Sequence, residues 1–115
     1  MRKSGQLVLF RFPQTDLAPG KLRPALLLAS LPSGRNDWLV CMISSQITQA
    51  VAGVDEIITK SDADFAQSGL KTPSVIRLTR LAVVSDSIFF GNIGEISAAR
   101  LGVLKKRLAQ WIESS

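Results

Sequence analysis

The chain has 115 residues, a length that fits one domain with a hydrophobic core of its own. Hydrophobic residues make up 46% of the sequence and charged residues 20%, which excludes a disordered protein. The net charge of +5 favours acidic partners, but it does not separate nucleic acid from an acidic protein.

Several kinds of site are excluded by the residue types that are missing. The chain has no histidine, so it cannot form a Ser-His-Asp triad or a histidine metal site. Its single cysteine, Cys41, excludes an internal disulfide and a multi-cysteine zinc site. Because Cys41 lies in an apolar run, it fits a small buried hydrophobe better than a nucleophile.

The N-terminal segment does not fit a signal peptide, because Arg11 and Asp16 interrupt its short apolar stretch. No apolar run is long enough to span a bilayer. We therefore expect a cytoplasmic protein that does not enter a membrane.

Three apolar runs in the first part of the chain predict β-strands. The first covers Gln6–Phe12, and a polar loop of eight residues, 13–20, follows it. The second strand, Arg23–Ser30, is a continuous apolar run, which is typical of a strand buried on both faces. A turn over Pro32–Asp37 leads to the third strand, Trp38–Ser44.

The middle of the chain predicts a short strand and a small helix. The strand covers Val54–Thr59. The segment Ser61–Gly69 carries the start and stop signals of a helix of about two turns. Ser61 is the expected N-cap, and Asp62 and Asp64 are explained by favourable placement near a helix N-terminus. That structural role fits these two acids better than a metal or catalytic role.

The last part of the chain predicts a basic strand, a short strand and a longer helix. Ser74–Val84 alternates apolar with polar residues, and Ile88–Gly94 reads as a final short strand or turn. From Ser97, a natural N-cap, the apolar residues follow a helical period: Leu101, Leu104, Leu108 and Trp111 or Ile112. We expect its charged residues to form a solvated face: Arg100, Lys105, Lys106 and Arg107.

These elements predict a mainly β fold. The short connections favour antiparallel pairing, so we expect a small antiparallel barrel with a short inserted helix and a C-terminal helix. No P-loop, glycine-rich dinucleotide turn or metal motif is present.

A candidate anion site lies at the strand ends. Arg23 precedes a proline, and this keeps Arg23 extended and holds its guanidinium at the entrance of the second strand. The third strand ends in two hydroxyls and an amide, those of Ser44, Ser45 and Gln46. This pattern is compatible with a phosphate site, or with a surface ion pair between Arg23 and Asp55 or Glu56.

The order of four segments resembles the motifs of the PemK/MazF toxin family. These segments are Gly5–Leu17 with Lys21–Leu26, Cys41–Gln46, Gly69–Arg77 and Asn92–Ser97. The likeness extends over nearly the whole chain, so residues 1–115 are expected to form a single toxin domain.

The resemblance implies an SH3-like barrel with a C-terminal helix, a homodimer, and an endoribonuclease that needs no metal or other cofactor. Such toxins cleave single-stranded RNA and are held in check by a cognate antitoxin. In this chemistry the 2′-hydroxyl of the RNA attacks the adjacent phosphate, so the protein orients the groups and stabilises charge.

Carried over by motif, Arg23 is the arginine of the family's Arg-Pro pair and Ser44 is its cooperating hydroxyl. Ser45 and Gln46 add hydrogen-bond donors. Arg77 matches the arginine of an Arg-x-Asp pair that some relatives use, but Thr79 stands at the Asp position. Arg77 is then expected to contact phosphates. Asp16, in the first loop, is a candidate base or a contact to an RNA base.

Two alternatives stay open at this point. The chain is similar in architecture to a sibling family of gyrase poisons, whose action depends on a Trp-Gly-Ile ending. Here Trp111 and Ile112 are adjacent and three further residues follow, which counts against that activity. The other alternative is a non-catalytic module of the same fold that only binds RNA or protein.

Overall fold

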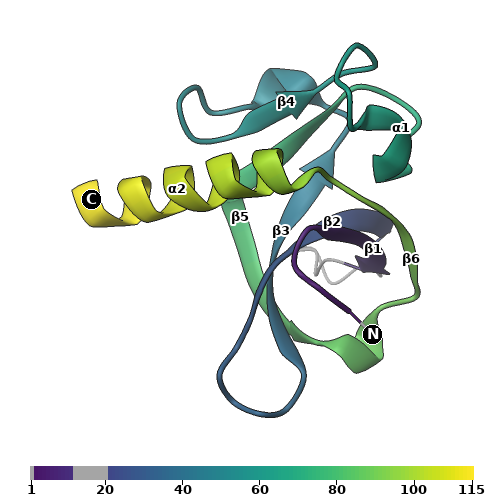
Figure 1. The fold of residues 1–115 in the computed structure, drawn as a ribbon, viewed down its shortest axis with the longest axis vertical. Coiled ribbons are helices and arrows are strands. Elements are labelled where there is room, and N and C mark those ends of the chain that lie inside the picture. The colour runs from purple at the N-terminus through teal and green to yellow at the C-terminus, as the bar shows by residue number, and fades with distance from the viewer. Residues whose placement is uncertain (1, 12–20) are drawn as a thin grey trace.

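The computed structural model describes residues 2–11 and 21–115, which form one curled, six-stranded antiparallel sheet with two α-helices (Figure 1). The strands are β1 Gln6–Arg11, β2 Leu22–Ser30, β3 Asp37–Ser44, β4 Glu56–Ile58, β5 Ser74–Ser85 and β6 Gly91–Glu95. The helices are α1 Phe65–Ser68 and α2 Ala98–Ser114, with short 3-10 turns at Ile47–Gln49 and Asp86–Ile88. The order across the sheet is β4-β5-β3-β2-β1-β6. The predicted mainly β fold is confirmed.

The sheet has a hydrophobic cluster on each face. Alternate residues of a strand point to opposite faces, so Leu26 and Leu28 of β2 join one cluster, whereas Ala25 and Leu27 join the other. Helix α2 lies across the first face (Figure 1). The second cluster includes Trp38, which is buried. The prediction that the second strand, β2, is buried on both faces is confirmed.

Helix α2 begins and packs as its sequence predicts. The Ser97 hydroxyl accepts a hydrogen bond from the backbone N–H of Arg100 at 3.1 Å, which caps the helix. Leu104 and Leu108 are buried, and Leu101 and Trp111 pack against the same cluster. No helix of residues 2–11 and 21–115 is long and apolar enough to cross a membrane.

Helix α1 differs from its prediction, since it has a single turn that begins at Phe65. Ser61 is not its N-cap: the Ser61 hydroxyl lies 2.9 Å from the Thr59 hydroxyl. The carboxylate of Asp62 accepts a hydrogen bond from the Thr59 backbone N–H at 2.7 Å, so these residues form a turn instead of a first helical turn. Gly69 ends the helix in the left-handed region, as expected.

Two strands begin later than predicted. Strand β4 begins at Glu56, because the backbone N–H groups of Val54 and Asp55 bond to the Val51 carbonyl in a turn. Strand β6 begins at Gly91, because the chain before it, including Ile88, forms a 3-10 turn.

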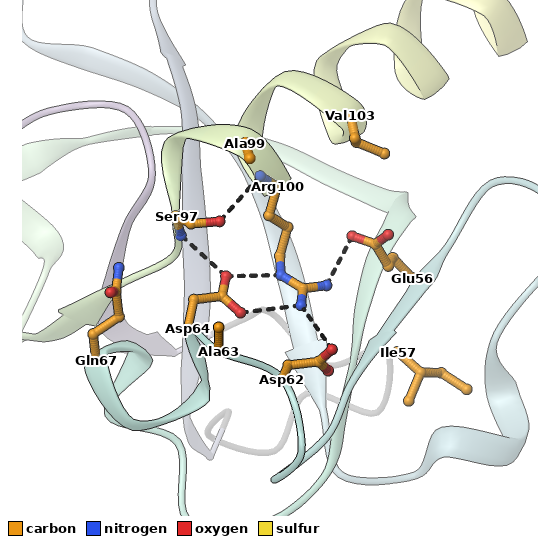
Figure 2. Close-up of a pocket in the computed structure, with 10 residues that line it drawn as sticks. All are labelled: Glu56, Ile57, Asp62, Ala63, Asp64, Gln67, Ser97, Ala99, Arg100 and Val103. Atoms are coloured by element: carbon orange, nitrogen blue, oxygen red, sulfur yellow. Dashed lines mark hydrogen bonds and ion pairs between the residues drawn. The ribbon is translucent and has the colours of Figure 1, made fainter.

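Arg100 lies among three carboxylates at the start of α2 (Figure 2). Its Nε and Nη2 atoms donate to the two oxygens of Asp64 at 2.8 and 3.0 Å. Its Nη1 atom donates to Glu56 at 3.0 Å, and Asp62 lies 3.4 Å away. Only 13% of the Arg100 side chain is exposed, so the expectation of a solvated arginine is wrong.

The same cluster explains the two acids that precede α1. The carboxylates of Asp64 and Asp62 pair with Arg100 on α2. Neither acid lies in the first turn of α1, and the Asp64 side chain makes no capping hydrogen bond to that helix. Hydrogen bonding from Arg100 holds the pKa of Asp64 below its usual range, although burial opposes this shift. The cluster therefore ties α2 to β4 and to the segment before α1.

Two glycines let the end of α1 approach β6 closely. A Cβ atom at Gly94 would overlap the Gln67 carbonyl oxygen and the Ser68 backbone, and one at Gly69 would overlap the Ile93 carbonyl oxygen. Gly69 also has φ +78°, a conformation that favours glycine. The backbone contact between α1 and β6 therefore depends on both residues.

We expect Gly94→Ala to destabilise the protein by about 1–3 kcal/mol, because the added methyl has no space. Gly102→Ala is the matched control: no atom lies within 4 Å of that Cβ position on α2, so this change is expected to stabilise by about 0.5–1 kcal/mol. Urea unfolding of both variants measures the two effects. Equal stability of the two variants would contradict the proposed contact.

The acid stability of the protein is expected to depend on Asp64. Because its folded-state pKa is lowered, the ionised carboxylate stabilises the fold above about pH 4, the usual unfolded pKa. This contribution is lost as the pH falls through the folded-state pKa. We expect Asp64→Asn to cost about 1–3 kcal/mol at neutral pH, with the difference from wild type shrinking below about pH 4. Urea unfolding across a pH series measures it; a difference that does not change with pH would argue against the pair.

Candidate functional site

A cavity of about 450 Å³ opens where the start of β2 and the end of β3 meet the loop that follows α1. Arg23 and Ser44, the two residues predicted to act together, both line it, and so does Ser45. The other lining residues are Leu9, Pro24, Ile43, Gly69, Leu70, Lys71, Thr72, Ser74 and Ile93. The close approach of α1 and β6 therefore also shapes this cavity, since it fixes Gly69 beside Ile93.

The strand register explains why Arg23 and Ser44 lie together. Ala25 of β2 pairs with Met42 of β3, and the two site residues each lie two positions beyond that pair on their own strands. Residues two apart on a strand point to the same face. Met42 also pairs with Arg77 of β5, so Arg77 shares this face. The sheet thus presents Arg23, Ser44 and Arg77 on one side.

Arg23 is partly buried, and its guanidinium makes no hydrogen bond or ion pair with the residues that the structure describes. The alternative of an ion pair with Asp55 or Glu56 is wrong. Asp55 bonds to Thr79 and lies near Arg77, while Glu56 pairs with arginines of α2. None of the described residues therefore occupies the N–H donors of Arg23, which can bind a ligand.

The hydroxyl of Ser44 is held by the turn that follows it. Its Oγ atom accepts a hydrogen bond from the backbone N–H of Gln46 at 3.1 Å, and the residue is 5% exposed. Within residues 2–11 and 21–115 the hydroxyl proton has no acceptor, so it can be donated into the cavity. Gln46 itself does not line the cavity; its side-chain oxygen accepts a hydrogen bond from Gln49 at 2.7 Å.

The other predicted site residues lie beside the cavity or cannot be placed. Arg77 donates through Nη1 to the Gln49 side chain at 3.1 Å and does not line the cavity. Thr79 donates through its backbone N–H and its hydroxyl to Asp55, at 3.1 and 3.2 Å. Asp16 belongs to residues 12–20, which lie outside the part of the chain that the structure describes.

Three polar lining residues were not predicted as site residues: Lys71, Thr72 and Ser74. They belong to the Gly69–Arg77 segment, whose resemblance to a family motif was the only signal that could have identified them. Lys71 is exposed and adds a second cation to that of Arg23, and none of the described lining residues is acidic. The charge of the cavity therefore suits an anion.

A second cavity, of about 480 Å³, surrounds Arg100 (Figure 2). Its charged groups already bind one another, because Arg100 is held by Asp64, Glu56 and Asp62. These interactions leave no free guanidinium edge for a ligand, so the cluster is explained by its role in stabilising the fold.

Cys41 is fully buried, as its apolar surroundings predicted. Burial, with a smaller contribution from Asp55, raises the pKa of its thiol well above the usual range, so the reactive thiolate is disfavoured. Among the described residues no group of three Cys, Asp or Glu side chains is arranged to hold a metal ion.

Comparisons with known proteins agree with this architecture. A sequence model of the family described as PemK-like, MazF-like toxin of type II toxin-antitoxin system matches residues 3–112. A search of curated protein sequences gives no match.

Two solved structures are similar in fold. Mycobacterium tuberculosis toxin MazF-mt6 has a TM-score of 0.69 and 16% identity, over 94% of this chain and 96% of that one. An endoribonuclease in complex with its cognate antitoxin, from a mycobacterial species, has a TM-score of 0.68 and 13% identity, over 98% and 96%. On the match of its sequence from residue 3 to residue 112, the chain belongs to the PemK-like, MazF-like toxins of type II toxin–antitoxin systems.

Proposed function

We propose that the whole chain is one toxin domain that acts as a metal-independent endoribonuclease on single-stranded RNA. The observation that carries the proposal is the cavity that both Arg23 and Ser44 line, in which the Arg23 guanidinium has no partner among the described residues. Membership of the toxin family supports it, and so does the fold shared with a protein described as an endoribonuclease.

The reaction uses a nucleophile that the substrate supplies. The 2′-oxygen of a ribose forms a bond to the adjacent phosphorus, and the bond from phosphorus to the 5′-oxygen breaks. The products are a 2′,3′-cyclic phosphate and a free 5′-hydroxyl. Because attack and departure must be in line, the site favours an unpaired strand that can adopt this geometry.

Arg23 stabilises the charge that develops on the phosphate. Its planar guanidinium can donate two parallel hydrogen bonds to the non-bridging oxygens, which become more negative in the transition state. Ser44 donates its free hydroxyl proton to the same group, and Ser45 and Lys71 add a donor and a positive charge at the cavity wall. Arg77, on the same face of the sheet, contacts a neighbouring phosphate.

The proposal assigns the role of general base to Asp16. The alternative role of Asp16 is contact with an RNA base. None of the described residues that line the cavity is acidic, so the proposal takes the carboxylate from outside that set. The loop that carries Asp16 joins β1 to β2, and Leu9 of β1 and Arg23 of β2 both line the cavity.

The proposed protein partner is a cognate antitoxin with an acidic inhibitory segment. The net charge of +5 suits such a segment, and so does the lack of acidic side chains among the described residues that line the cavity. A structural neighbour was solved as a complex with its cognate antitoxin, which supports the same kind of partner. In this proposal the protein acts in the cytoplasm, where RNA is available.

The proposal includes a homodimer that forms at β5. Strand β4 pairs only with residues 74–76 of β5, so the rest of that edge has no strand partner in the described chain. Leu81 and Val83, beyond that point, are 37% and 56% exposed. An unpaired edge with exposed apolar side chains tends to pair with another chain, and we propose a second copy.

We expect the purified protein to cleave a long single-stranded RNA in the presence of EDTA and to leave 5′-hydroxyl ends. Arg23→Ala should abolish cleavage, and Ser44→Ala should slow it by roughly 10²–10³-fold, because each removes a donor to the developing charge. End-labelling of the fragments with and without prior phosphatase treatment identifies the 5′ ends.

The matched control is Arg35→Ala, which removes an exposed arginine from the turn at the opposite ends of β2 and β3 and should cleave at the wild-type rate. Wild-type protein that binds the RNA and leaves it intact would instead support the non-catalytic module.

Val83→Asp is expected to convert the dimer into a monomer, because it places a charge in the proposed apolar interface. Sedimentation velocity measures the change in mass. The matched control is Phe90→Asp, which places the same charge on a side chain that is 64% exposed. Phe90 precedes β6, at the opposite edge of the sheet, so this variant should remain a dimer. A wild-type monomer, or equal dissociation in both variants, would exclude this interface.

A further inference from the structure

Asp55 is a buried carboxylate that the proposed cleavage chemistry does not use. Its side chain is 0% exposed and both of its oxygens accept hydrogen bonds. The Val51 backbone N–H donates to Oδ2 at 2.9 Å, and the Thr79 backbone N–H donates to Oδ1 at 3.1 Å. The Thr79 hydroxyl lies 3.2 Å from each oxygen. Burying a charged carboxylate costs free energy unless the carboxylate is hydrogen-bonded and paired with a nearby cation.

The cation that Asp55 faces is Arg77. The Arg77 Nε atom lies 3.9 Å from Asp55 Oδ2, and only 16% of the arginine side chain is exposed. That Nε atom is buried and has no hydrogen-bond partner among the described residues. The charge of Asp55 is therefore the main attraction that holds the inner edge of the guanidinium in place. The side chain of Arg107, the other nearby cation, reaches only the Asp55 backbone carbonyl, at 3.5 Å.

The outer end of Arg77 contacts the turn that follows Ser44. Its Nη1 atom donates to the Gln49 side chain, and the Gln49 side chain donates to the Gln46 side chain. The Gln46 backbone N–H in turn donates to the Ser44 hydroxyl, so Arg77 and Ser44 are linked through Gln49 and Gln46. Gln49 is exposed and neutral, so a phosphate oxygen can replace it as the stronger acceptor.

A local irregularity of β5 brings Thr79 to Asp55. Cys41 pairs with Leu81 and Met42 with Arg77, so residues 78–80 of β5 have no partner on β3. Such a bulge redirects a side chain, and here it turns the Thr79 hydroxyl toward the buried carboxylate. The backbone N–H of Thr79 points to the same carboxylate.

We infer that Asp55 is a positioning residue for RNA cleavage. Together with Thr79, it supplies the carboxylate that an aspartate at position 79 would supply, and it holds Arg77 on the face of the sheet that also carries Ser44. Arg77 keeps its inner edge on Asp55 and presents its outer nitrogens to an RNA phosphate. Asp55 does not touch the RNA, because its side chain is fully buried. This inference rests on the proposed function.

The first test moves the carboxylate from one position to the other. Asp55→Asn removes the charge at nearly constant shape and should lower kcat by roughly 10- to 100-fold, because a displaced guanidinium stabilises the transition state poorly. Adding Thr79→Asp to that variant returns a carboxylate to the same place and should recover most of the lost kcat. Thr79→Asp alone places two carboxylates side by side and should not improve cleavage.

Asp64→Asn is the matched control, since Asp64 is also buried and also holds an arginine, Arg100, and neither of the two lines the candidate cavity. We expect it to lower stability and to leave kcat unchanged. If Asp55→Asn lowers kcat no more than Asp64→Asn does, or if the relocated carboxylate restores nothing, the inference is wrong.

The second test needs no RNA cleavage. The 15N–1H signal of Arg77 Nε should be resolved in the wild type, should shift and exchange faster in Asp55→Asn, and should return in the double variant. Asp64→Asn should not shift this signal.

A wild type that cleaves no RNA would contradict the proposed function, whereas an Arg77 signal unchanged in Asp55→Asn would contradict the positioning role. Should Asp55→Asn fail to fold, Thr79→Val removes the hydroxyl alone and must shift the signal in the same direction.

Discussion

The antiparallel pairing of β2 with β3 is the constraint on which the candidate site depends. Arg23 enters β2 and Ser44 ends β3, and they share a face because Ala25 and Met42 pair in that register. A slip of one residue would turn one of the two side chains to the opposite face. Such a slip would also exchange the side chains that β2 contributes to the two hydrophobic clusters, and close-packed clusters tolerate such changes of volume poorly. Burial of the sheet therefore fixes the geometry of the site.

The arginines of this protein fall into two electrostatic classes. Arg100 is surrounded by carboxylates and joins α2 to the rest of the fold, so its charge is neutralised internally. Arg23 and Lys71 face a cavity with no described acidic residue, so their charge remains available. Arg77 is intermediate, because Asp55 holds one edge of it and an exposed glutamine holds the other. The distribution of the acids decides which arginines can bind an anion.

Local sequence signals predicted the elements whose causes are local. The N-cap Ser97, the glycine that ends α1, and the burial of β2 on both faces all follow from neighbouring residues. The errors at Ser61 and at the starts of β4 and β6 come from turns between neighbouring residues. The errors at Asp64 and Arg100 have a distant cause, since these two residues are 36 positions apart. The contact between Thr79 and Asp55 spans 24 positions and a bulge that has no sequence signature. The meeting of Arg23 with Ser44 was suggested by the places of these residues at two strand ends, and the resemblance to a family strengthened the prediction.

One wall of the cavity comes from a different part of the chain than Arg23 and Ser44, which lie on β2 and β3. Leu70, Lys71 and Thr72 lie in a short connection whose start is fixed by the contact of Gly69 with β6 and whose end is fixed by the beginning of β5. Substitutions in this connection can reshape the wall while the sheet, its register and the guanidinium stay in place. Under the proposed function, such substitutions alter which nucleotides the cavity accepts and leave Arg23, Ser44 and the core unchanged.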